Sequence, residues 1–456
     1  MKVLKFGGSV LKNAEDVKNI AHILDLQSKN GEQIVVVVSA FFGITNKLLE
    51  LVNLATNKNG YTESLNNIKK FHFDLANALD IDAENENEIE NLFNKLEHIL
   101  ITIHDSELLS NDLRDAIISF GERLSSFIIF SYLAKFEDVA QIFPNELIKT
   151  NSNFGCATVN ISESNDLISS CINNIDAKII ICAGFIGADA NGKITTLGRN
   201  GSDYSAALIA SSVNANVLEI WKDTDGLYTA DPKIVKSAKF IKQITYQEMA
   251  ELSSLGNKIL HINAIAPCIA KHIPIVLRNC YNLSCPGTKV SDKECKNYLV
   301  NGIIKLDCVR VLTFSLGELI EFNETAIKLQ KLLKNYEDII ITISQNIKQR
   351  KICLLVSDYK SDRLLLDIDN IFLKEKKNGY LTVEIGKLKS MITIVGADLI
   401  NTCGVSGKIF GALEVNNINI DALNDDFSTT RISFLCNTDI SDKVINLLHD
   451  ELVNLH

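Results

Sequence analysis

The sequence predicts an α/β protein: a three-layer αβα sandwich with a mainly parallel sheet, followed by two small α+β domains of ferredoxin-like topology. Short apolar runs such as 34–38 and 177–187 alternate with amphipathic stretches through residue 290, as in a parallel sheet covered by helices. These runs are apolar at consecutive residues, which is typical of strands buried on both faces. Beyond residue 300 a shorter strand–helix pattern occurs twice.

The apolar runs of the N-terminal part are predicted as buried strands over 2–6, 33–40, 177–187, 216–221 and 273–279. Amphipathic stretches such as 13–30 and 203–213 are predicted as helices between them. Residues 56–112 interrupt this alternation, because they are rich in Asn, Glu and Lys and have helical periodicity. We expect a helical excursion there, acting either as a lid or as a solvated helical pair without a role in chemistry.

A Pro-Gly pair and a cluster of charges within 282–298 indicate a domain boundary. We therefore predict a large domain over 1–290 and two small domains over 300–380 and 388–456. Each small domain is expected to contain a strand–helix–strand–strand–helix unit. Tandem units of this kind favour a regulatory pair over a second catalytic domain.

The composition excludes several classes of protein. The 456 residues carry a net charge of −10, which gives no basic field for nucleic acid or an anionic membrane. The longest apolar runs are too short to span a bilayer. The eleven cysteines are scattered, without a CxxC pair or zinc spacing, which favours reduced thiols. Because the N-terminus opens on a strand pattern and not on a signal peptide, we expect a cytoplasmic protein.

Lys5 ends the first predicted strand and is followed closely by Gly7 and Gly8. Glycines let backbone N–H groups approach a ligand without a Cβ in the way, and such a turn before a helix can bind phosphate. The same pattern also fits an ordinary tight turn. This stretch alone therefore predicts only a candidate phosphate site.

Arg199 lies on a predicted loop between Gly198 and Gly201, where its planar guanidinium can meet a carboxylate. Asp203 follows at the N-terminal end of a predicted helix. The alternatives are a solvated loop arginine and an aspartate that only caps the helix.

The strand over 216–221 leads into a polar segment over 221–233 at the carboxyl edge of the sheet, where open α/β folds bind ligands. Lys222 and Lys233 can meet phosphates there, and Tyr228 can lie against a base or ribose. The alternative is a turn-rich surface loop.

Two further polar residues lie in apolar surroundings. Thr45 opens a predicted helix after a turn at Gly43, and Glu122 lies in a helix beside Phe120 and Leu124. A glutamate in such a helix suits an ammonium group as a buried acceptor, although an ion pair on the helix surface remains an alternative.

Taken together, these stretches resemble the aspartate kinases of the amino acid kinase superfamily, in order and in spacing, through residue 290. The matching segments are KFGGSV (5–10), VSAFFGITN (38–46), FGERLS (120–125), GFIG (184–187), TTLGRNGSDYSAALIA (195–210), WKDTDGLYTADPK (221–233) and GNKILH (256–261). The tail resembles paired ACT domains, most clearly over 395–423. We expect a monofunctional enzyme, without a homoserine dehydrogenase segment.

The resemblance implies transfer of a phosphoryl group from ATP to the β-carboxylate of L-aspartate, the first step toward lysine, threonine and methionine. Lys5 and Asp203 are the implied catalytic residues. The implied aspartate-binding residues are Thr45, Glu122, Arg199 and Ser202. The implied nucleotide-binding residues are Lys5, Phe6, Gly7, Gly8, Ser9, Lys222, Asp223, Tyr228, Lys233 and Lys258.

The chemistry of the substrate agrees with this assignment. A β-carboxylate is already ionised at neutral pH, so the reaction needs no general base. The barrier comes from bringing one anion to another, and positioning and charge neutralisation by lysine and Mg²⁺ lower it. We expect ATP oxygens to hold most of the Mg²⁺ shell, with no dedicated metal ligands and with Asp203 or Asp223 helping through water.

Two alternatives remain at this point. One is another acid kinase of the superfamily, acting on glutamate or N-acetylglutamate, and the other is a catalytically inactive amino-acid sensor built on ACT domains. The ACT resemblance implies lysine or threonine as an effector and a homodimer or higher homo-oligomer. The first ACT-like unit lacks the usual glycine pattern in 314–333, so its effector is left open.

Overall fold

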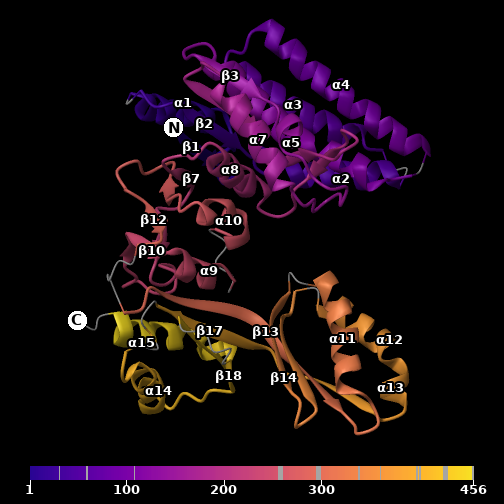
Figure 1. Cartoon of the computed structure of the whole chain (residues 1–456), viewed down its shortest axis with the longest axis vertical. Coiled ribbons are helices and arrows are strands. Elements are labelled where there is room, and N and C mark those ends of the chain that lie inside the picture. Colours follow the sequence, from indigo (N-terminus) through magenta and orange to yellow (C-terminus); the bar gives the residue numbers. More distant parts are fainter. Residues whose placement is uncertain are drawn as a thin grey trace. The chain divides into compact units, whose positions relative to one another are not determined.

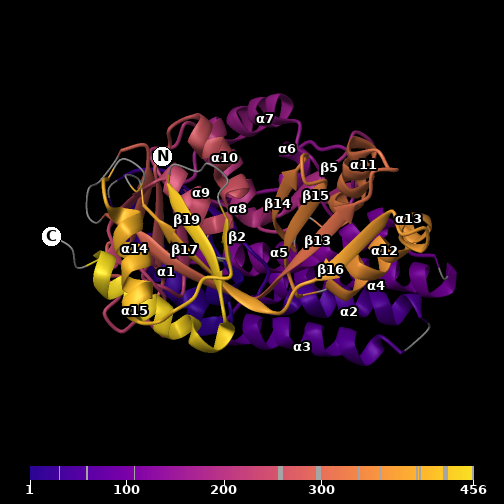
Figure 2. The ribbon, with the colours of Figure 1, turned by 90° about the horizontal axis from the view of Figure 1, so that it is seen from below.

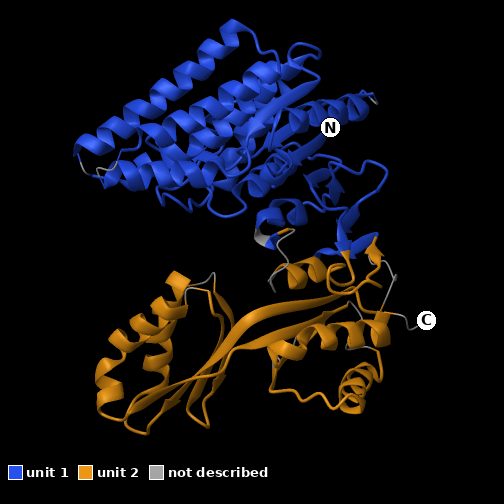
Figure 3. Ribbon diagram, turned by 180° about the vertical axis from the view of Figure 1, so that it is seen from behind, with its two compact units in different colours: residues 1–227, 242–246, 261–294 blue, residues 228–241, 247–260, 295–456 orange. Residues whose placement is uncertain are grey.

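The computed structural model describes residues 1–29, 31–57, 60–106, 108–254, 260–293, 299–336, 339–359, 361–396, 399, 402–424 and 430–453. The chain divides into two compact units (Figure 3). Unit 1 contains residues 1–227, 242–246 and 261–294, and unit 2 contains residues 228–241, 247–260 and 295–456. The predicted domain boundaries place 228–241 in the large domain, whereas this segment groups with unit 2. The boundaries themselves stay predictions.

Unit 1 is built on an eight-stranded sheet in the order β10-β12-β11-β7-β1-β2-β4-β3 (Figure 1). All neighbours are parallel except β11 and β12, which confirms the predicted mainly parallel sheet. The strands are β1 (Lys2–Phe6), β2 (Ile34–Val38), β3 (Val139–Ile142), β4 (Ile179–Ala183), β7 (Leu218–Lys222), β10 (Gln243–Thr245), β11 (Ile275–Asn279) and β12 (Thr288–Ser291). A separate hairpin pairs β5 (Ile186–Ala188) with β6 (Ile194–Thr196).

Helices cover both faces of this sheet, which explains why β2 and β4 are buried at every residue. The helices of unit 1 are α1 (Ala14–Ser28), α2 (Ile44–Thr56), α3 (Thr62–Ala78), α4 (Ala83–Ser106), α5 (Asn111–Leu133), α6 (Pro144–Leu147), α7 (Ile161–Asn173), α8 (Gly201–Ser212) and α10 (Ile262–Ala270). Leu4 and Phe6 of β1 belong to the core formed with α1 and α5. Side chains alternate along a strand, so Lys5 faces the opposite side, where α8 contacts β1, β2 and β7.

The predicted helical excursion corresponds to α3 and α4, and these helices are not a solvated pair. Apolar side chains of both helices, including Ile68 and Leu96, are buried in the same core as α2 and α5. Among the described residues, one helix, α5, is long and apolar enough to cross a membrane, but 72% of its apolar window is buried inside the structure. It is therefore the core helix of unit 1.

The core between α3 and α4 contains a histidine, and we predict that it makes unit 1 sensitive to acid. His72 is fully buried among the rings of Phe41, Phe71 and Phe93. Burial lowers the pKa of His72 to about 4, although its hydrogen bond with the Ile68 carbonyl acts in the opposite direction. The unfolded chain then binds more protons below pH 6.5, so stability falls as pH falls.

The expected loss is about 2 kcal/mol of unfolding free energy between pH 8 and pH 5. Urea denaturation at both pH values measures it, and His72→Leu should remove this part of the pH dependence. His22→Leu, at an exposed histidine of α1, is the matched control and should leave the dependence in place. An unchanged pH dependence in His72→Leu would contradict the prediction.

Unit 2 is built on an antiparallel sheet in the order β14-β15-β13-β17-β19-β18, with β16 paired to β13 (Figure 2). Its elements are α9 (Tyr246–Ser254), β13 (Gly302–Leu316), α11 (Phe322–Leu333), β14 (Ile340–Asn346), β15 (Lys351–Ser357), α12 (Ser361–Ile371), α13 (Leu373–Lys377), β16 (Leu381–Ile385), β17 (Lys389–Val395), α14 (Val405–Val415), β18 (Ala422–Asn424), β19 (Arg431–Cys436) and α15 (Ser441–Val453). Two separate cores, one with α11 and α12 and one with α14 and α15, agree with the two predicted α+β modules.

The two modules share one strand, which the sequence analysis did not predict. The start of β13 pairs with β17 of the second module, and its end pairs with β15 and β16 of the first. The pairing register shifts between Leu306 and Val309, where Cys308 has a positive φ of 56°. This irregularity lets one 15-residue strand serve both modules.

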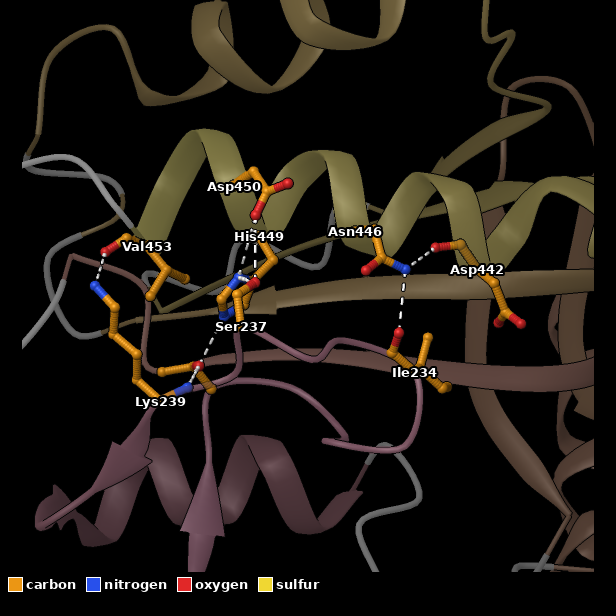
Figure 4. Close-up of polar contacts among 9 residues, drawn as sticks. Ile234, Ser237, Lys239, Asp442, Asn446, His449, Asp450 and Val453 are labelled. Atoms are coloured by element: carbon orange, nitrogen blue, oxygen red, sulfur yellow. Dashed lines mark hydrogen bonds and ion pairs between the residues drawn. The ribbon is translucent and has the colours of Figure 1, made fainter.

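The segment 228–241 is fixed to α15 within unit 2 (Figure 4). Both ring nitrogens of buried His449 meet hydroxyl groups of this segment, Nε2 with Thr229 at 2.9 Å and Nδ1 with Ser237 at 3.3 Å. Asn446 donates to the Ile234 carbonyl at 3.3 Å. These contacts explain why a segment that follows β7 in the chain groups with the C-terminal helix.

Candidate active site

Lys5, Asp203 and Lys222 form a buried charge cluster in unit 1. Lys5 Nζ lies 2.5 Å from Oδ1 of Asp203, and Lys222 Nζ lies 4.0 Å from Oδ2 of the same carboxylate. The side chains of Lys5 and Asp203 are only 6% and 4% exposed. Within this cluster two ammonium groups face one carboxylate, and a positive group in a site shielded from water attracts an anion strongly.

The sheet brings the two lysines together. β1 and β7 are parallel neighbours, with Phe6 opposite Trp221 in the register, so both strands end at the same edge. The rings of Phe6 and Trp221 stack at 5.9 Å, and the Gly7 N–H donates to the Trp221 carbonyl at 3.3 Å. Lys222 is the last residue of β7 and therefore lies beside the turn that follows β1.

Three glycines of the matching motifs allow close approaches around this cluster. A Cβ on Gly7 would lie 3.4 Å from Lys5 Nζ, and one on Gly8 would lie 3.2 Å from the Ala40 carbonyl oxygen. A Cβ on Gly184 would clash with Ser202 at 2.6 Å. Because these residues have no side chains, the first turn of α8 and the Gly7-Gly8 backbone can lie close to the sheet edge. Ser9 follows in the same short helical turn.

The charges of the cluster support one another. Burial opposes ionisation of Asp203, but Lys5 and Lys222 outweigh it and keep the pKa of Asp203 below its usual value. Burial lowers the pKa of Lys222, an effect that Asp203 opposes and Lys5 reinforces. Asp203 is therefore ionised at neutral pH and holds the Lys5 ammonium group in place.

Glu122 is a second buried acidic group, in the middle of α5, and is 4% exposed. Burial raises its pKa to about 8, although the Ala40 and Glu122 backbone and Lys5 act in the opposite direction. Among the described residues, no hydrogen-bond donor reaches its Oε2. A buried carboxyl group with a free oxygen is a candidate acceptor for a ligand ammonium group.

Arg199 is exposed on the loop between β6 and α8. Gly198 and Asn200 on either side have positive φ angles of 75° and 57°, so the chain reverses sharply before α8 begins. Ser202 is buried in the first turn of α8, next to Asp203. The loop thus places a guanidinium, a hydroxyl and the acid of the charge cluster within five consecutive residues.

Thr45 and Asp223 are linked to the cluster less directly. Thr45 lies partly exposed in the first turn of α2, after Gly43 with a φ of 79°. Asp223 is exposed directly after β7. Among the described residues, no hydrogen bond or ion pair joins either side chain to Lys5 or Asp203.

Three predicted nucleotide-binding residues are not part of unit 1 as described. Tyr228 belongs to unit 2, where its ring meets Phe240 edge-on at 5.6 Å. Lys233 is exposed in unit 2, and its backbone N–H donates to Asp231 at 2.8 Å. Lys258 lies outside the described residues. Their roles stay predictions.

Sequence reasoning missed two aspartates that hold loops of the site. Asp225 accepts hydrogen bonds from Asn279 at 2.8 Å and Asn282 at 2.9 Å, which fixes the loop after β7. Asp115 of α5 is 1% exposed and accepts backbone N–H groups from the turn at Gly155 and from Thr196 at the end of β6. Its position seven residues before Glu122, on the same face of an apolar helix, is a signal that the sequence contained.

The chain is similar to known proteins in both sequence and structure. Residues 1–279 match the family model described as the amino acid kinase family, and residues 392–452 match an ACT domain. The bifunctional aspartokinase/homoserine dehydrogenase of Buchnera aphidicola is 33% identical and aligns with 99% of this chain and 56% of its own length. The chain spans about half the length of the bifunctional relatives that it matches.

Proteins of similar length also match. The lysine-sensitive aspartokinase 3 of Escherichia coli is 29% identical over 99% of this chain and 98% of its own. The crystal structure of Escherichia coli aspartokinase III with aspartate and ADP has a TM-score of 0.81 at 26% identity, covering 99% of both chains. That of Clostridium acetobutylicum aspartate kinase has a TM-score of 0.80 at 25% identity, covering 99% of this chain and 100% of that one.

Proposed function

The chain belongs to the amino acid kinase family, and on this premise we propose that it is an aspartate kinase, which transfers a phosphoryl group from ATP to the β-carboxylate of L-aspartate. The observation that carries the proposal is the buried cluster of Lys5, Asp203 and Lys222 at the carboxyl edge of the sheet. The similarity along the full length of Escherichia coli aspartokinase III, whose structure contains aspartate and ADP, supports the same substrates here.

In the proposed reaction, the β-carboxylate oxygen attacks the γ-phosphorus of ATP, and ADP leaves with the electrons of the broken P–O bond. Two anions approach each other, so the protein lowers the barrier mainly by positive charge. Lys5 neutralises charge on the transferring group, and Lys222 neutralises charge on the nucleotide phosphates. Asp203 orients Lys5 through their ion pair. It does not act as a general base, because its lowered pKa makes it a poor proton acceptor at neutral pH.

The amino acid is proposed to bind through four side chains. Glu122 accepts the α-ammonium group, Arg199 meets the α-carboxylate, and Ser202 and Thr45 donate hydrogen bonds. The free Oε2 of Glu122 in an otherwise apolar helix supports the first contact. The exposed position of Arg199, close in the chain to Ser202, supports the second.

ATP is proposed to bind as its Mg²⁺ complex over the Gly7-Gly8 turn, with Phe6, Ser9, Tyr228, Lys233 and Lys258 as further predicted nucleotide contacts. Among the described residues there is no cluster of three or more side chains able to hold a metal ion. Mg²⁺ prefers phosphate oxygens and water with one or two carboxylates, so the ATP phosphates would supply most of its ligands. Exposed Asp223 is the available carboxylate, since Asp203 is engaged by two lysines. Bound Mg²⁺ would supply further neutralisation of phosphate charge.

Regulation is proposed to occur through the ACT modules of unit 2. Escherichia coli aspartokinase III has been crystallised with lysine in a T-state, and the chain matches that structure with a TM-score of 0.80 at 27% identity. We infer an amino-acid effector, lysine or threonine, and a homodimer or higher homo-oligomer in the cytoplasm. Steady-state turnover with and without each amino acid tests the effector.

The central test is ATP-dependent formation of an acyl phosphate, trapped by hydroxylamine as the hydroxamate. We expect turnover with L-aspartate and far less with L-glutamate or N-acetyl-L-glutamate. Preferential turnover of either glutamate substrate would replace the proposal with another acid kinase. A complete lack of hydroxamate with all three would favour a catalytically inactive amino-acid sensor.

A substitution at Arg199 tests the proposed carboxylate contact. Arg199→Ala should raise the KM for aspartate about 10- to 150-fold, which corresponds to roughly 1.5–3 kcal/mol for a charge-assisted hydrogen bond. The KM for ATP should change little, because the nucleotide makes no proposed contact with Arg199. Lys193→Ala, at an exposed cation of the β5–β6 hairpin, is the matched control. An unchanged KM for aspartate would remove Arg199 from the site.

A further inference from the structure

Asp115 joins a turn and the end of a strand in unit 1 through a single oxygen atom. Its Oδ2 accepts the Gly155 N–H at 2.8 Å and the Thr196 N–H at 2.7 Å. Gly155 lies in a turn between β3 and α7, and Thr196 is the last residue of β6. The carboxylate is therefore a bridge between the helix α5, the turn and the strand that leads to Arg199.

The turn held by Asp115 packs directly against the arginine loop. Ala157 donates its N–H to the Thr196 carbonyl at 2.9 Å. A Cβ on Gly198 would lie 3.1 Å from Cys156 Sγ and 3.4 Å from the Gly155 carbonyl oxygen. The backbone of residue 198 thus rests on the turn, and the position of Arg199, one residue later, follows from where Asp115 fixes that turn.

The buried carboxyl group of Asp115 is not fully hydrogen-bonded, which packing alone does not explain. Asp115 is 1% exposed, and burial raises its pKa, while the Gly155 and Thr196 N–H groups oppose that effect. Among the described residues, no donor reaches its other oxygen, Oδ1. An under-satisfied buried carboxyl group is unfavourable for folding, so its presence is better explained by a role in the site.

Asp115 and Glu122 lie on the same face of α5, because seven residues are close to two full helical turns. In the proposed function, Glu122 accepts the α-ammonium group and Arg199 meets the α-carboxylate. The first group is part of α5, and the second is tied to α5 through Asp115. One rigid helix therefore sets the distance between the two groups that recognise the amino-acid end of the substrate.

We propose that Asp115 is a positioning residue for substrate recognition, which holds the Arg199 loop at a fixed distance from Glu122 and so keeps the two groups that bind the amino-acid end of the substrate in register. This inference rests on the proposed function. It assigns Asp115 no contact with the substrate and no part in phosphoryl transfer.

The test compares Asp115→Asn and Asp115→Ser with Asp112→Asn, a control on the same helix whose acid pairs with Lys193 at the surface. We expect the two Asp115 variants to raise the KM for aspartate about 10- to 100-fold, the effect of misplacing a binding group by about 1 Å. The KM for ATP should stay within about threefold of the wild type. The control should behave as the wild type.

A double-mutant cycle separates positioning from general damage. If Asp115 acts through Arg199, its substitution should have little further effect in the Arg199→Ala background, whereas independent effects would add. Full additivity would overturn the inference, and so would an unchanged aspartate KM in an active Asp115→Asn enzyme. Inactivity of the wild type with aspartate would instead contradict the proposed function.

Hydrogen–deuterium exchange of the unmodified protein gives a second test that does not depend on folding of the variants. Saturating aspartate should slow exchange in residues 153–157 together with residues 196–200, although the turn contains no proposed ligand residue. Protection of 196–200 alone would contradict the bridge.

Discussion

Replacing Lys5 by methionine is expected to lower kcat by about 10²- to 10³-fold, the range for removal of one preorganised charge that acts on the transition state. The KM for aspartate should change by less than about threefold, since Lys5 makes no proposed contact with the amino-acid end. The structural reason is the position of Lys5 Nζ, which is buried beside the Gly7-Gly8 turn and held by Asp203 at 2.5 Å.

The control for this experiment is Lys12→Met, which removes an exposed cation only seven residues further along the chain. It should retain wild-type kcat. Breaking a buried ion pair by removing one partner costs about 3–5 kcal/mol, so folding of the Lys5 variant must be checked by thermal unfolding. A folded Lys5→Met enzyme with near-normal kcat would refute the assigned role.

Asp203→Asn tests whether Asp203 orients Lys5 or acts as a general base. The variant keeps the shape of the side chain but leaves two ammonium groups without their shared counter-charge. We expect kcat to fall less than in Lys5→Met, because Lys5 remains present. A general base would behave differently, since it would make the kcat of the wild type depend on pH in the range of its pKa, and its loss would remove that dependence. A kcat that is independent of pH in both enzymes would support orientation.

The central sheet could be predicted from the sequence because the apolar pattern of each strand lies within a few consecutive residues. Strands buried on both faces are apolar at every residue, as in 34–38, and no tertiary information is needed to recognise them. The helices α3 and α4 were predicted as helices but not as part of the core. Their sequences are rich in Asn and Glu, which lie on the outer faces, and only a narrow stripe of residues such as Leu65 and Leu96 is buried.

Long-range features could not be predicted in the same way. The resemblance placed residues 5, 203 and 222 in one site, but their direct contacts follow from the pairing of β1 with β7 and from the packing of α8 on both strands. The contacts of Asp115 could not be predicted, because its partners are backbone N–H groups. Nearly every residue has such a group, so no side-chain pattern in the sequence indicates them. The shared strand β13 depends on a register shift at Cys308, a residue type that does not indicate a bulge.

The second large expected effect is the release of a proton from Glu122 when aspartate binds. Its pKa of about 8 means that roughly nine-tenths of the free enzyme carries a protonated Glu122 at pH 7. Binding of an ammonium group favours the ionised form, because an opposite charge lowers the pKa of a buried acid. Aspartate binding at pH 7 should therefore release close to one proton, and the KM for aspartate should fall about tenfold per pH unit between pH 6 and pH 7.5.

Isothermal calorimetry in two buffers of different ionisation enthalpy measures this proton directly. Glu122→Gln should abolish the release and raise the KM for aspartate by about 100-fold, since the neutral amide cannot balance the buried ammonium charge. Glu50→Gln, at an exposed glutamate of α2, should leave both quantities unchanged. Burial alone would give Glu122 the same raised pKa without any ligand, so the decisive result is the coupling to aspartate. Binding that releases no proton at pH 7, with a KM independent of pH below 8, would show that the ammonium group lies elsewhere.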